Sequence, residues 1–497
     1  MKSPSYHRKK PRRLCGRIAL PKIKIPFITP VSQDTDVAAQ DSAVRQIFDG
    51  YLDVVGTEVS LFKRPGLANW NQPTSSSIDG LFDWDENNML VFVSNATVYA
   101  YDSTDTLITL GSLPSSGVRV VFAQAKISGE QILCMCADGP IFRTDGTASS
   151  LTQITDVDAP SRATHLAFLD NYLIANNNID GDRGRFFWSD VSAPTSWSST
   201  SFQGADGKPD DIMSLAVGYR ELIIVGRLTT EYFYNDGDTP FRRLEGSEAQ
   251  VGSPARYSLT FAGGEWIFLT NKRKFVMMQN RVAKVISADI DQTLKAMTTV
   301  SDCRGDIMIV DGKEFLIFTF PTENRSFVFD SLLNVWYEWG NWNSATSTYR
   351  IFRGVSFAFS ERRNAQFVGD VSNGRIYKLS PTQYSDYSGM PIRTMLETGF
   401  ISHGTHNYKR SNSLQMRLKT GSGSTQGQVM FKYRDIDNEA YGNEIFLSSN
   451  FSTANGNFFC SLYQMGMYRA RQYQIIHTDS TPFILSDIQE DVEMLLR

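Results

Sequence analysis

A short apolar motif recurs along this chain at nearly constant intervals. Each occurrence joins two or three large apolar residues, and most end in Asp or Asn, as in Phe186-Phe-Trp-Ser-Asp190. The spacing runs from 42 residues, between Phe233 and Phe275, to 53 residues, between Phe275 and Val328. Apolar runs closed by Asn, Asp or Gly are typical of short strands joined by tight turns. The seven occurrences centre on Tyr99, Phe142, Phe187, Phe233, Phe275, Val328 and Ile376.

This interval matches the roughly 40 to 50 residues of a four-stranded propeller blade. One sheet of that size exposes an apolar face that it cannot cover alone, whereas radial stacking covers each sheet with the next. We therefore predict an all-β fold built on a β-propeller of six or seven blades. The alternative is a set of β-sandwiches, whose strands repeat every ~8 to 12 residues.

The 497 residues are too many for one hydrophobic core, so several domains are expected. Residues 1–45 should form an extended basic N-terminal arm, and residues 46–77 should hold strands that lead into the propeller. The propeller should occupy residues 78–385, and a C-terminal β-sandwich should occupy residues 386–497. The sandwich is predicted from alternating apolar and polar residues at 414–418, 429–433 and 473–477.

Charge divides the chain into a basic arm and an acidic body. The first 25 residues hold nine basic residues and no acid, which leaves 40 basic against 53 acidic residues, a balance of −13, in the remainder. Several prolines predict that the arm is extended and not helical. Such an arm binds nucleic acid or an acidic protein surface, or is only solvated, and charge alone does not choose. The candidate partner-binding residues are Arg8, Lys9, Lys10, Arg12 and Arg13.

The sequence carries no catalytic, cofactor or metal-binding motif. Phosphate-binding loops, dinucleotide fingerprints, zinc-protease histidine pairs and the hydrolase serine elbow are all missing. His403 and His406 lie beside a glycine, and Asp206, Asp210 and Asp211 lie in a polar loop, which favours solvated residues over metal ligands. We expect no enzyme activity, no catalytic residue, no metal and no cofactor.

Three further features of the sequence limit where the protein can fold and what it can bind. The five cysteines are scattered and mostly set in apolar runs, which is typical of small core residues in a protein that folds in a reducing cytoplasm. No apolar run approaches the ~18 residues of a membrane span, so we expect none. Three tryptophans at 336, 339 and 342 favour packing between blades over sugar stacking.

Several short segments together resemble a known family. They include Lys63-Arg-Pro-Gly-Leu67, Val217-Gly-Tyr-Arg-Glu-Leu-Ile-Ile-Val-Gly226 and Phe261-Ala-Gly-Gly-Glu-Trp-Ile-Phe268, and they continue to Pro482-Phe-Ile-Leu485. In order and spacing they are similar to the tail hub, or nozzle, proteins of short-tailed bacteriophages, also called packaged DNA stabilisation proteins. The resemblance covers the chain from about Phe48 onwards. The basic arm is not part of the family pattern, so its role stays open.

The resemblance implies a structural protein of the virion tail that is assembled in the host cytoplasm. Such proteins form a homo-hexamer below the portal and its adaptor ring, with tail fibres or tailspikes and a plug or needle attached. Double-stranded DNA is retained by the ring and passes through its lumen without sequence specificity. The acidic body suits such a channel, because carboxylates repel phosphate. The sequence does not define which residues line the channel.

A second function class stays open beside this one. A glycan-binding or glycan-cleaving β-propeller would need paired carboxylates, or a tyrosine with an arginine cluster, in the central funnel. Sialidases of this kind also carry a characteristic turn motif in their blades. Ser189-Asp190 with Trp197 matches that motif poorly, because the glycine and the spacing are missing.

Overall fold

The chain is built almost entirely of strands. The computed structural model describes residues 23–25, 44–55, 58–127, 129–205, 207–208, 210–238, 240–420, 427–438, 440–448 and 457–495. The arm residues Arg8, Lys9, Lys10, Arg12 and Arg13 lie outside this part of the chain. No helix in the described ranges is long and apolar enough to cross a membrane. The helical segments there are α1 (Asp291–Ala296), η1 (Asp85–Asn87), η2 (Ala288–Ile290) and η3 (Tyr387–Gly389).

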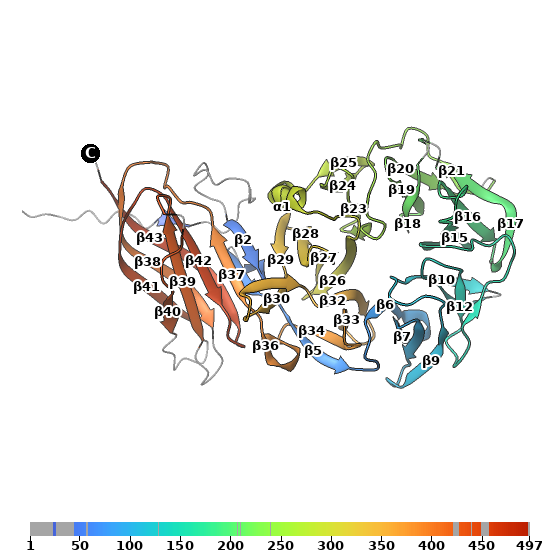
Figure 1. Cartoon of the computed structure of the whole chain (residues 1–497), viewed down its shortest axis with the longest axis horizontal. Helices are drawn as coiled ribbons and strands as arrows, with labels where there is room; N and C mark the ends of the chain where they lie inside the picture. Colours follow the sequence, from blue (N-terminus) through green and yellow to red (C-terminus); the bar gives the residue numbers. More distant parts are fainter. Residues whose placement is uncertain are drawn as a thin grey trace, which may run out of the picture.

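Seven four-stranded antiparallel arrays form the propeller (Figure 1). In the first six the strands follow chain order from the axis outwards, and the seventh takes its outer strand from the N-terminal segment. The first three consist of β6 (Ile78–Trp84), β7 (Met89–Ser94), β8 (Thr97–Tyr101) and β9 (Leu107–Ser112); β10 (Val121–Ile127), β11 (Glu130–Cys136), β12 (Phe142–Thr144) and β13 (Thr152–Gln153); and β14 (Leu166–Leu169), β15 (Tyr172–Asn176), β16 (Arg185–Asp190) and β17 (Ala193–Gly204). The next two consist of β18 (Ile212–Gly218), β19 (Glu221–Gly226), β20 (Thr230–Tyr234) and β21 (Arg242–Arg243); and β22 (Thr260–Ala262), β23 (Glu265–Leu269), β24 (Phe275–Gln279) and β25 (Val282–Val285). The last two consist of β26 (Arg304–Val310), β27 (Lys313–Phe320), β28 (Arg325–Asp330) and β29 (Val335–Glu338); and β32 (Gly354–Ser360), β33 (Ala365–Asp370), β34 (Ile376–Ser380) and β5 (Gly66–Asn71).

Apolar packing between neighbouring blades closes the ring. Blades one and two share a buried cluster that contains Val91 and Leu133, and every later pair of neighbours shares a cluster of the same kind. The seventh blade returns to the first through Phe367 and Phe92, both fully buried. Each sheet thus covers its neighbour's apolar face, which confirms the propeller prediction, and the blade number is seven.

The recurring apolar motif occupies the same place in every blade. Its seven centres lie on β8, β12, β16, β20, β24, β28 and β34, the third strand of each array. Tight turns separate these strands from their neighbours. Asn95–Ala96, before the third strand of the first blade, and Asp170–Asn171, between the first two strands of the third blade, each supply two consecutive positive φ angles, as the two-residue hairpin turns favoured by twisted strands require. The blade-length spacing therefore reflects one structural unit per repeat.

The seventh blade takes its outer strand from the N-terminal part of the chain. β5 pairs antiparallel with β34, so Leu67 stands opposite Leu379 across more than 300 residues of sequence. Sequence analysis assigned residues 46–77 to strands that lead into the propeller, and β5 lies within a blade. Because β5 is followed in the chain by β6, the inner strand of the first blade, this pairing connects the last blade to the first.

Gly66 sits where the closing strand passes closest to another backbone. A Cβ atom at this position would lie 2.3 Å from the Ser385 carbonyl oxygen and 2.7 Å from the Gln383 carbonyl oxygen. We expect Gly66→Ala to lower the free energy of unfolding by about 1–3 kcal/mol, because backbone must shift to admit the methyl group. Urea denaturation measures this loss. Gly139→Ala is the matched control, since its nearest neighbour would be 3.7 Å away, and equal losses in both variants would contradict the explanation.

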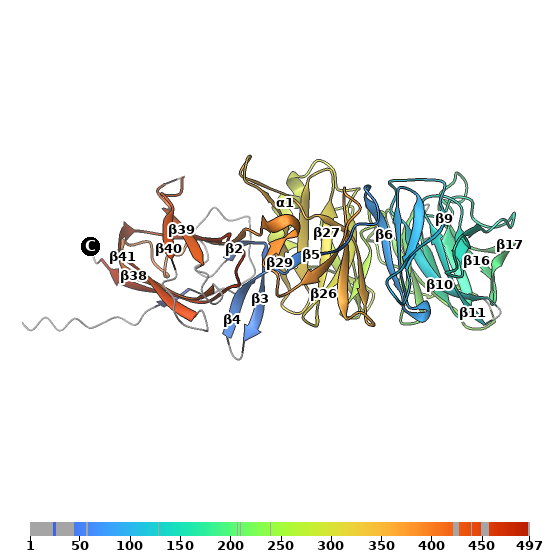
Figure 2. The same ribbon diagram turned by 90° about the horizontal axis from the view of Figure 1, so that it is seen from below.

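Two further sheets form a β-sandwich beside the propeller (Figures 1 and 2). Along β38 buried and exposed residues alternate, and Leu414 and Met416 face Phe431 and Ile475 in a shared core. This confirms the predicted sandwich, although four of its strands come from the N-terminal segment. One sheet orders β3 (Gly50–Val55), β4 (Glu58–Lys63), β43 (Phe483–Met494), β38 (Lys409–Thr420) and β41 (Asn457–Tyr468), with β1 (Ile23–Lys24) on β43. The other orders β2 (Val44–Phe48), β37 (Thr394–Thr398), β42 (Arg471–His477), β39 (Gln428–Asp435) and β40 (Ile445–Ser448).

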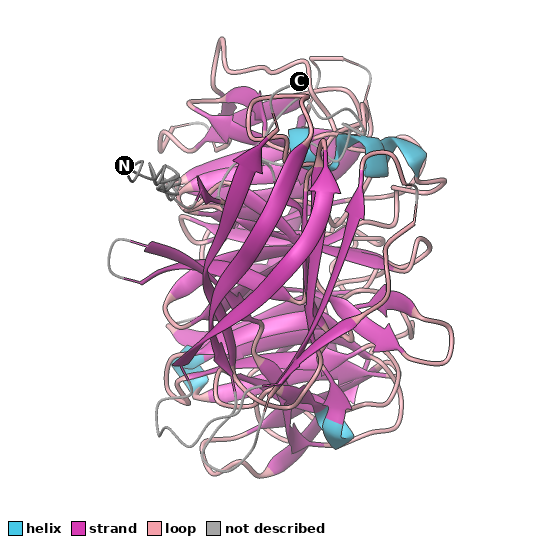
Figure 3. Ribbon diagram, turned by 90° about the vertical axis from the view of Figure 1, so that its left-hand side faces the viewer, coloured by secondary structure: helices cyan, strands magenta, loops and turns pink. Residues whose placement is uncertain are grey.

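The sandwich is continuous with the propeller through one strand contact. β2 pairs in parallel with β29, where Phe48 stands opposite Glu338, so the sixth blade and one sandwich sheet form a single nine-stranded sheet. Figure 3 shows the long sandwich strands crossing in front of the propeller. Two small hairpins lie at this boundary: β30 (Gly340–Asn343) with β31 (Thr348–Ile351), and β35 (Ser385–Asp386) with β36 (Met390–Pro391).

Candidate functional site

The histidines and aspartates singled out from the sequence lie apart from one another. His403 contacts the Glu490 carboxylate at 3.1 Å and the Tyr468 hydroxyl at 3.0 Å inside the sandwich, whereas His406 is exposed. No group of three or more His, Cys, Asp or Glu side chains that could hold a metal ion occurs in the described part of the chain. The two histidines therefore do not form a shared site.

Asp210 has a structural role in the fourth blade. Its carboxylate accepts hydrogen bonds from the backbone N–H groups of Arg227 at 2.9 Å, Leu228 at 2.5 Å and Thr229 at 3.0 Å. These bonds hold the turn between β19 and β20. Asp211 lies beside Arg227 on the surface at 3.4 Å, and Asp206 lies outside the described residues.

Side chains cross the propeller axis at the end where the inner strands begin. Arg119, which leads into the second blade, makes a two-pronged ion pair with Asp306 of the sixth blade at 2.5 and 2.7 Å. His165 of the third blade stacks on Tyr257 of the fifth, with ring centroids 5.3 Å apart. Burial, followed by the charges of Arg256 and Arg119, lowers the pKa of His165 to about 3, so the ring is neutral. These four residues form the axial bridge.

The axial bridge limits what the propeller's centre can do. The Arg119–Asp306 pair joins the second and sixth blades, which lie across the ring from each other, so side chains cross the propeller's tunnel. The His165–Tyr257 contact joins the third and fifth blades, on either side of the fourth. Arg119 uses its guanidinium on Asp306 and approaches the Gly305 carbonyl oxygen at 3.4 Å. An arginine engaged in this way is a structural tie between blades.

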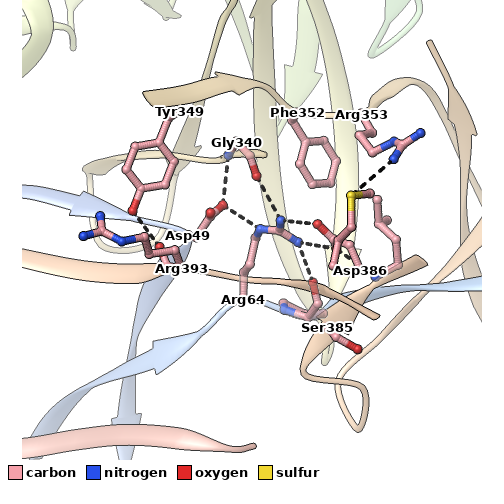
Figure 4. Close-up of polar contacts among 12 residues, drawn as sticks. Asp49, Arg64, Gly340, Tyr349, Phe352, Arg353, Ser385, Asp386 and Arg393 are labelled. Carbon is pink, nitrogen blue, oxygen red and sulfur yellow. Dashed lines mark hydrogen bonds and ion pairs between the residues drawn. The ribbon is translucent and has the colours of Figure 1, made fainter. Parts of the chain in front are cut away.

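A buried arginine connects the propeller to the sandwich (Figure 4). The Arg64 Nε atom donates to Asp49 Oδ1 at 2.7 Å, and its two terminal nitrogens donate to the Asp386 oxygens at 2.9 and 2.7 Å. The same nitrogens also donate to the carbonyl oxygens of Pro65 at 3.1 Å and Gly340 at 3.0 Å. All five N–H groups of the guanidinium are thus used, in a side chain that is 1% exposed.

The partners of Arg64 come from every segment that passes between the two domains. Asp49 separates β2 from β3 at the start of the sandwich, and Asp386 lies in the segment that leaves the seventh blade. Gly340 follows the sixth blade, and Arg64 itself precedes the closing strand β5. Asp386 also accepts the backbone N–H of Leu67 at 3.2 Å. We name Arg64, Asp49, Asp386 and Gly340 the junction cluster, because they fix the sandwich on the propeller as one body.

Comparison with protein families identifies the chain. The model of the family described as "Bacteriophage P22 Gp10, beta-propeller" matches residues 47–384, a range that begins in β2 and ends beyond the seventh blade. The chain belongs to this family. As a member of the P22 Gp10 family it is a structural protein of a bacteriophage, and the predicted resemblance to packaged DNA stabilisation proteins is confirmed.

Solved structures resemble this P22 Gp10 family member only distantly. The WD40 β-propeller domain of Doa1 is 10% identical with a TM-score of 0.39, over 64% of this chain and 97% of that one. The extracellular domain of a hybrid two-component system, BT4673 from B. thetaiotaomicron, is 11% identical with a TM-score of 0.42, over 72% of this chain and 44% of that one. At such TM-scores we draw nothing from these likenesses. A comparison with curated proteins found no match.

Asp49 gives the junction cluster of this family member a pH dependence. Burial outweighs Arg64 and raises the pKa of Asp49 from 3.8 to about 6, and Asp49 Oδ2 has no hydrogen-bond partner among the described residues. Between these two pKa values the folded chain holds a proton that the unfolded chain has released. Stability should therefore fall as pH rises from about 4 to about 6, by roughly 3 kcal/mol from this group.

Asp49→Asn tests this dependence. The amide oxygen can still accept from Arg64, but the variant has no carboxylate to titrate, so its stability should change less than that of the wild type across the same pH window. Thermal unfolding of both proteins between about pH 4 and pH 7 measures the difference. Parallel curves for the two proteins would show that Asp49 does not titrate in this range.

Sequence reasoning missed the junction cluster. Arg64 lies within the segment that carried the family resemblance, yet an arginine before Pro-Gly is typical of an exposed turn. Asp386 lies in a segment rich in serine and tyrosine that reads as a linker. The available signal was an arginine between two apolar strands with no acid within five residues on either side, which favours a partner from elsewhere in the chain.

Proposed function

We propose that copies of this chain form a homo-hexameric ring, the hub or nozzle of a short phage tail. The ring would lie below the portal and its adaptor ring, retain the packaged DNA and conduct it during ejection. It would also anchor tail fibres or tailspikes and a plug or needle. The observation that carries this proposal is the family match over residues 47–384, together with the resemblance of the remaining sandwich strands to tail hub proteins.

The rigidity of the chain supports a mechanical role. Seven blades packed in a closed ring and the junction cluster give one body with two firmly joined domains. Because the axial bridge crosses the propeller's tunnel, the proposed DNA channel lies between copies and not inside one propeller. Head-to-tail contacts between identical subunits close into rings of this kind.

The acidic body supports passage of DNA without adhesion. Outside the first 25 residues the chain has 40 basic and 53 acidic residues, a balance of −13. A channel surface of this sign repels phosphates and avoids the many Lys and Arg contacts by which proteins hold DNA without sequence specificity. A solved ring whose channel is lined chiefly by Lys and Arg would contradict this part of the proposal.

Electron microscopy of the purified protein tests the ring. We expect a six-fold particle with a central hole, and infection with phage that lack this protein should give heads that lose their DNA. The virion tail is the proposed location and the host cytoplasm the proposed place of assembly. We also propose that the protein is not an enzyme. A monomer that cleaves polysaccharide would overturn the proposal in favour of the glycan-cleaving alternative.

The basic arm, with Arg8, Lys9, Lys10, Arg12 and Arg13, is proposed to bind the adaptor ring or neighbouring subunits. Because β1 pairs with β43, the informative deletion stops at residue 22 and leaves β1 in place. This deletion should weaken assembly while leaving the melting temperature of the body nearly unchanged. Normal assembly of virions without the arm would show that this role is wrong.

A further inference from the structure

The inner strands border two cavities on the axial side of the propeller, lined by apolar and polar side chains, which together are called the axial well. A cavity of about 490 Å³ is bordered by β6, β10, β14 and β18, and one of about 380 Å³ by β22, β26 and β32. Phe82, Phe122, Phe168 and Phe261 from four different blades stand in their walls. Both volumes lie within the roughly 300–1,000 Å³ of known ligand pockets. Glu86 lines the larger cavity, is exposed and lies in the turn between β6 and β7. The cavity therefore opens at the end of the propeller that carries the turns between the first and second strands of the blades, away from the axial bridge.

The face of the propeller around the mouth of this well is acidic, and Glu86 from that face lines the larger cavity. Exposed carboxylates stand at the first hairpin turns of four adjacent blades, and none of them makes an ion pair with a described residue. These residues are Asp85, Glu86, Glu130, Asp311 and Glu361.

The basic residues at the same turns are mostly engaged already. Arg220 pairs with Asp170 at 2.8 Å and Arg363 with Asp105 at 2.9 Å. Lys313 pairs with Asp53. Lys126, which lines the larger cavity, and Arg362, which donates to the carbonyl oxygens of Asn88 and Ser103, are exposed and make no ion pair within the described ranges, so these two cations offset part of the five carboxylates. An occupant of this well is therefore expected to combine positive charge with apolar side chains.

The chain itself contains a segment of that composition. Residues 1–22 carry eight basic residues and no acid, and Arg12, Arg13 and Arg17 are interleaved with Leu14 and Ile18. Fully extended, 22 residues reach roughly 75 Å. This segment leaves the body at β1, on the sandwich, where Ile25 is buried and its N–H donates to the Ile488 carbonyl oxygen at 2.9 Å.

We propose that the arm of one copy docks into the acid-rimmed axial well of a neighbouring copy. The arginines of the arm pair with the rim carboxylates, and Leu14 and Ile18 enter the well between the phenylalanine rings. The inference rests on the proposed ring of copies and assigns the arm one of the two partners proposed above. Each subunit of the ring is then tied to the next by a strap as well as by its packed surface.

A disulfide trap tests this docking in the full-length chain. The arm carries Cys15, and Glu86→Cys places a second thiol at the mouth of the well. Oxidation by copper-phenanthroline in air should link neighbouring copies into multimers on a non-reducing gel, about tenfold faster than for untethered thiols. Combining Glu86→Cys with Cys15→Ser should abolish the link, and adding Arg12→Glu and Arg13→Glu should slow it.

The matched control is Val157→Cys, an exposed position in the loop that leads to the inner strand of the third blade, at the axial-bridge end. It should give no faster linkage than wild type. Equal linkage at both positions, no linkage at Glu86→Cys, or a link within one chain would each overturn the proposal. Native mass spectrometry of the same samples tests the docking of the arm separately from the proposed hexameric ring. Rings without the link refute the docking alone, whereas wild type that forms no ring refutes the proposed function.

Discussion

Replacing Arg64 with methionine is expected to lower the free energy of unfolding by about 3–5 kcal/mol at neutral pH. The substitution removes the positive charge shared by Asp49 and Asp386 and leaves both carboxylates buried, where Arg64 is 1% exposed. It also removes the hydrogen bond to the Gly340 carbonyl oxygen. Scanning calorimetry measures the loss.

The pH dependence and a surface control make this prediction specific. The deficit of Arg64→Met should shrink in acid, because protons can neutralise the two stranded carboxyls that arginine no longer pairs. Arg220→Met, whose side chain is 79% exposed in its pair with Asp170, should cost less than about 1 kcal/mol. If both variants lose the same stability, the junction cluster is not what joins the domains.

Trp339→Ala is expected to cost about 3–5 kcal/mol as well. The indole is fully buried, contacts Phe315 and Phe352 with ring centroids 6.0 and 6.1 Å apart, and donates from Nε1 to the Gly50 carbonyl oxygen at 3.0 Å. The variant leaves a large cavity and an unsatisfied carbonyl at the boundary between the sixth blade and the sandwich. Chemical denaturation followed by circular dichroism measures the loss.

Trp342 provides the matched control three residues away. It is only partly buried, lies edge-on to Tyr349 at 4.9 Å and is covered by the Arg393 guanidinium at 4.0 Å. Trp342→Ala should therefore cost about 1 kcal/mol, the scale of one exposed cation–π contact. A larger loss for Trp342→Ala than for Trp339→Ala would contradict the assignment of Trp339 to the core.

The propeller could be predicted because most of its strands pair with their neighbours in the sequence. Each blade is a run of consecutive hairpins, so one apolar strand per blade recurs in the sequence at blade length. Val328 marks a third strand as clearly as Tyr99 does and Ile376 more weakly, although the spacing widens where α1 and the β30–β31 hairpin are inserted. The alternation along β38 likewise reports a strand with one buried face.

The long-range pairings were not predictable from those patterns. β5 reads like any other strand, and nothing in residues 66–71 indicates that its partner lies beyond residue 376. β3 and β4 were predicted to lead into the propeller, yet they extend a sandwich sheet whose other members, apart from β1, are C-terminal. The junction cluster and axial bridge were missed for the same reason, since Arg119 and Asp306 meet only after seven sheets close into a ring.

The pairing of β5 with β34 also sets the order in which the chain can fold during translation. Residues 66–71 leave the ribosome among the first strands, but their partner strand is synthesised about 300 residues later. At a synthesis rate of ~5–20 residues per second, β5 stays without its partner strand for tens of seconds, with unpaired backbone groups along its edge. The nascent protein is then exposed to aggregation until β34 has been made. Molecular chaperones that shield sheet edges should therefore raise its yield more than they raise the yield of propellers whose last blade consists of consecutive strands.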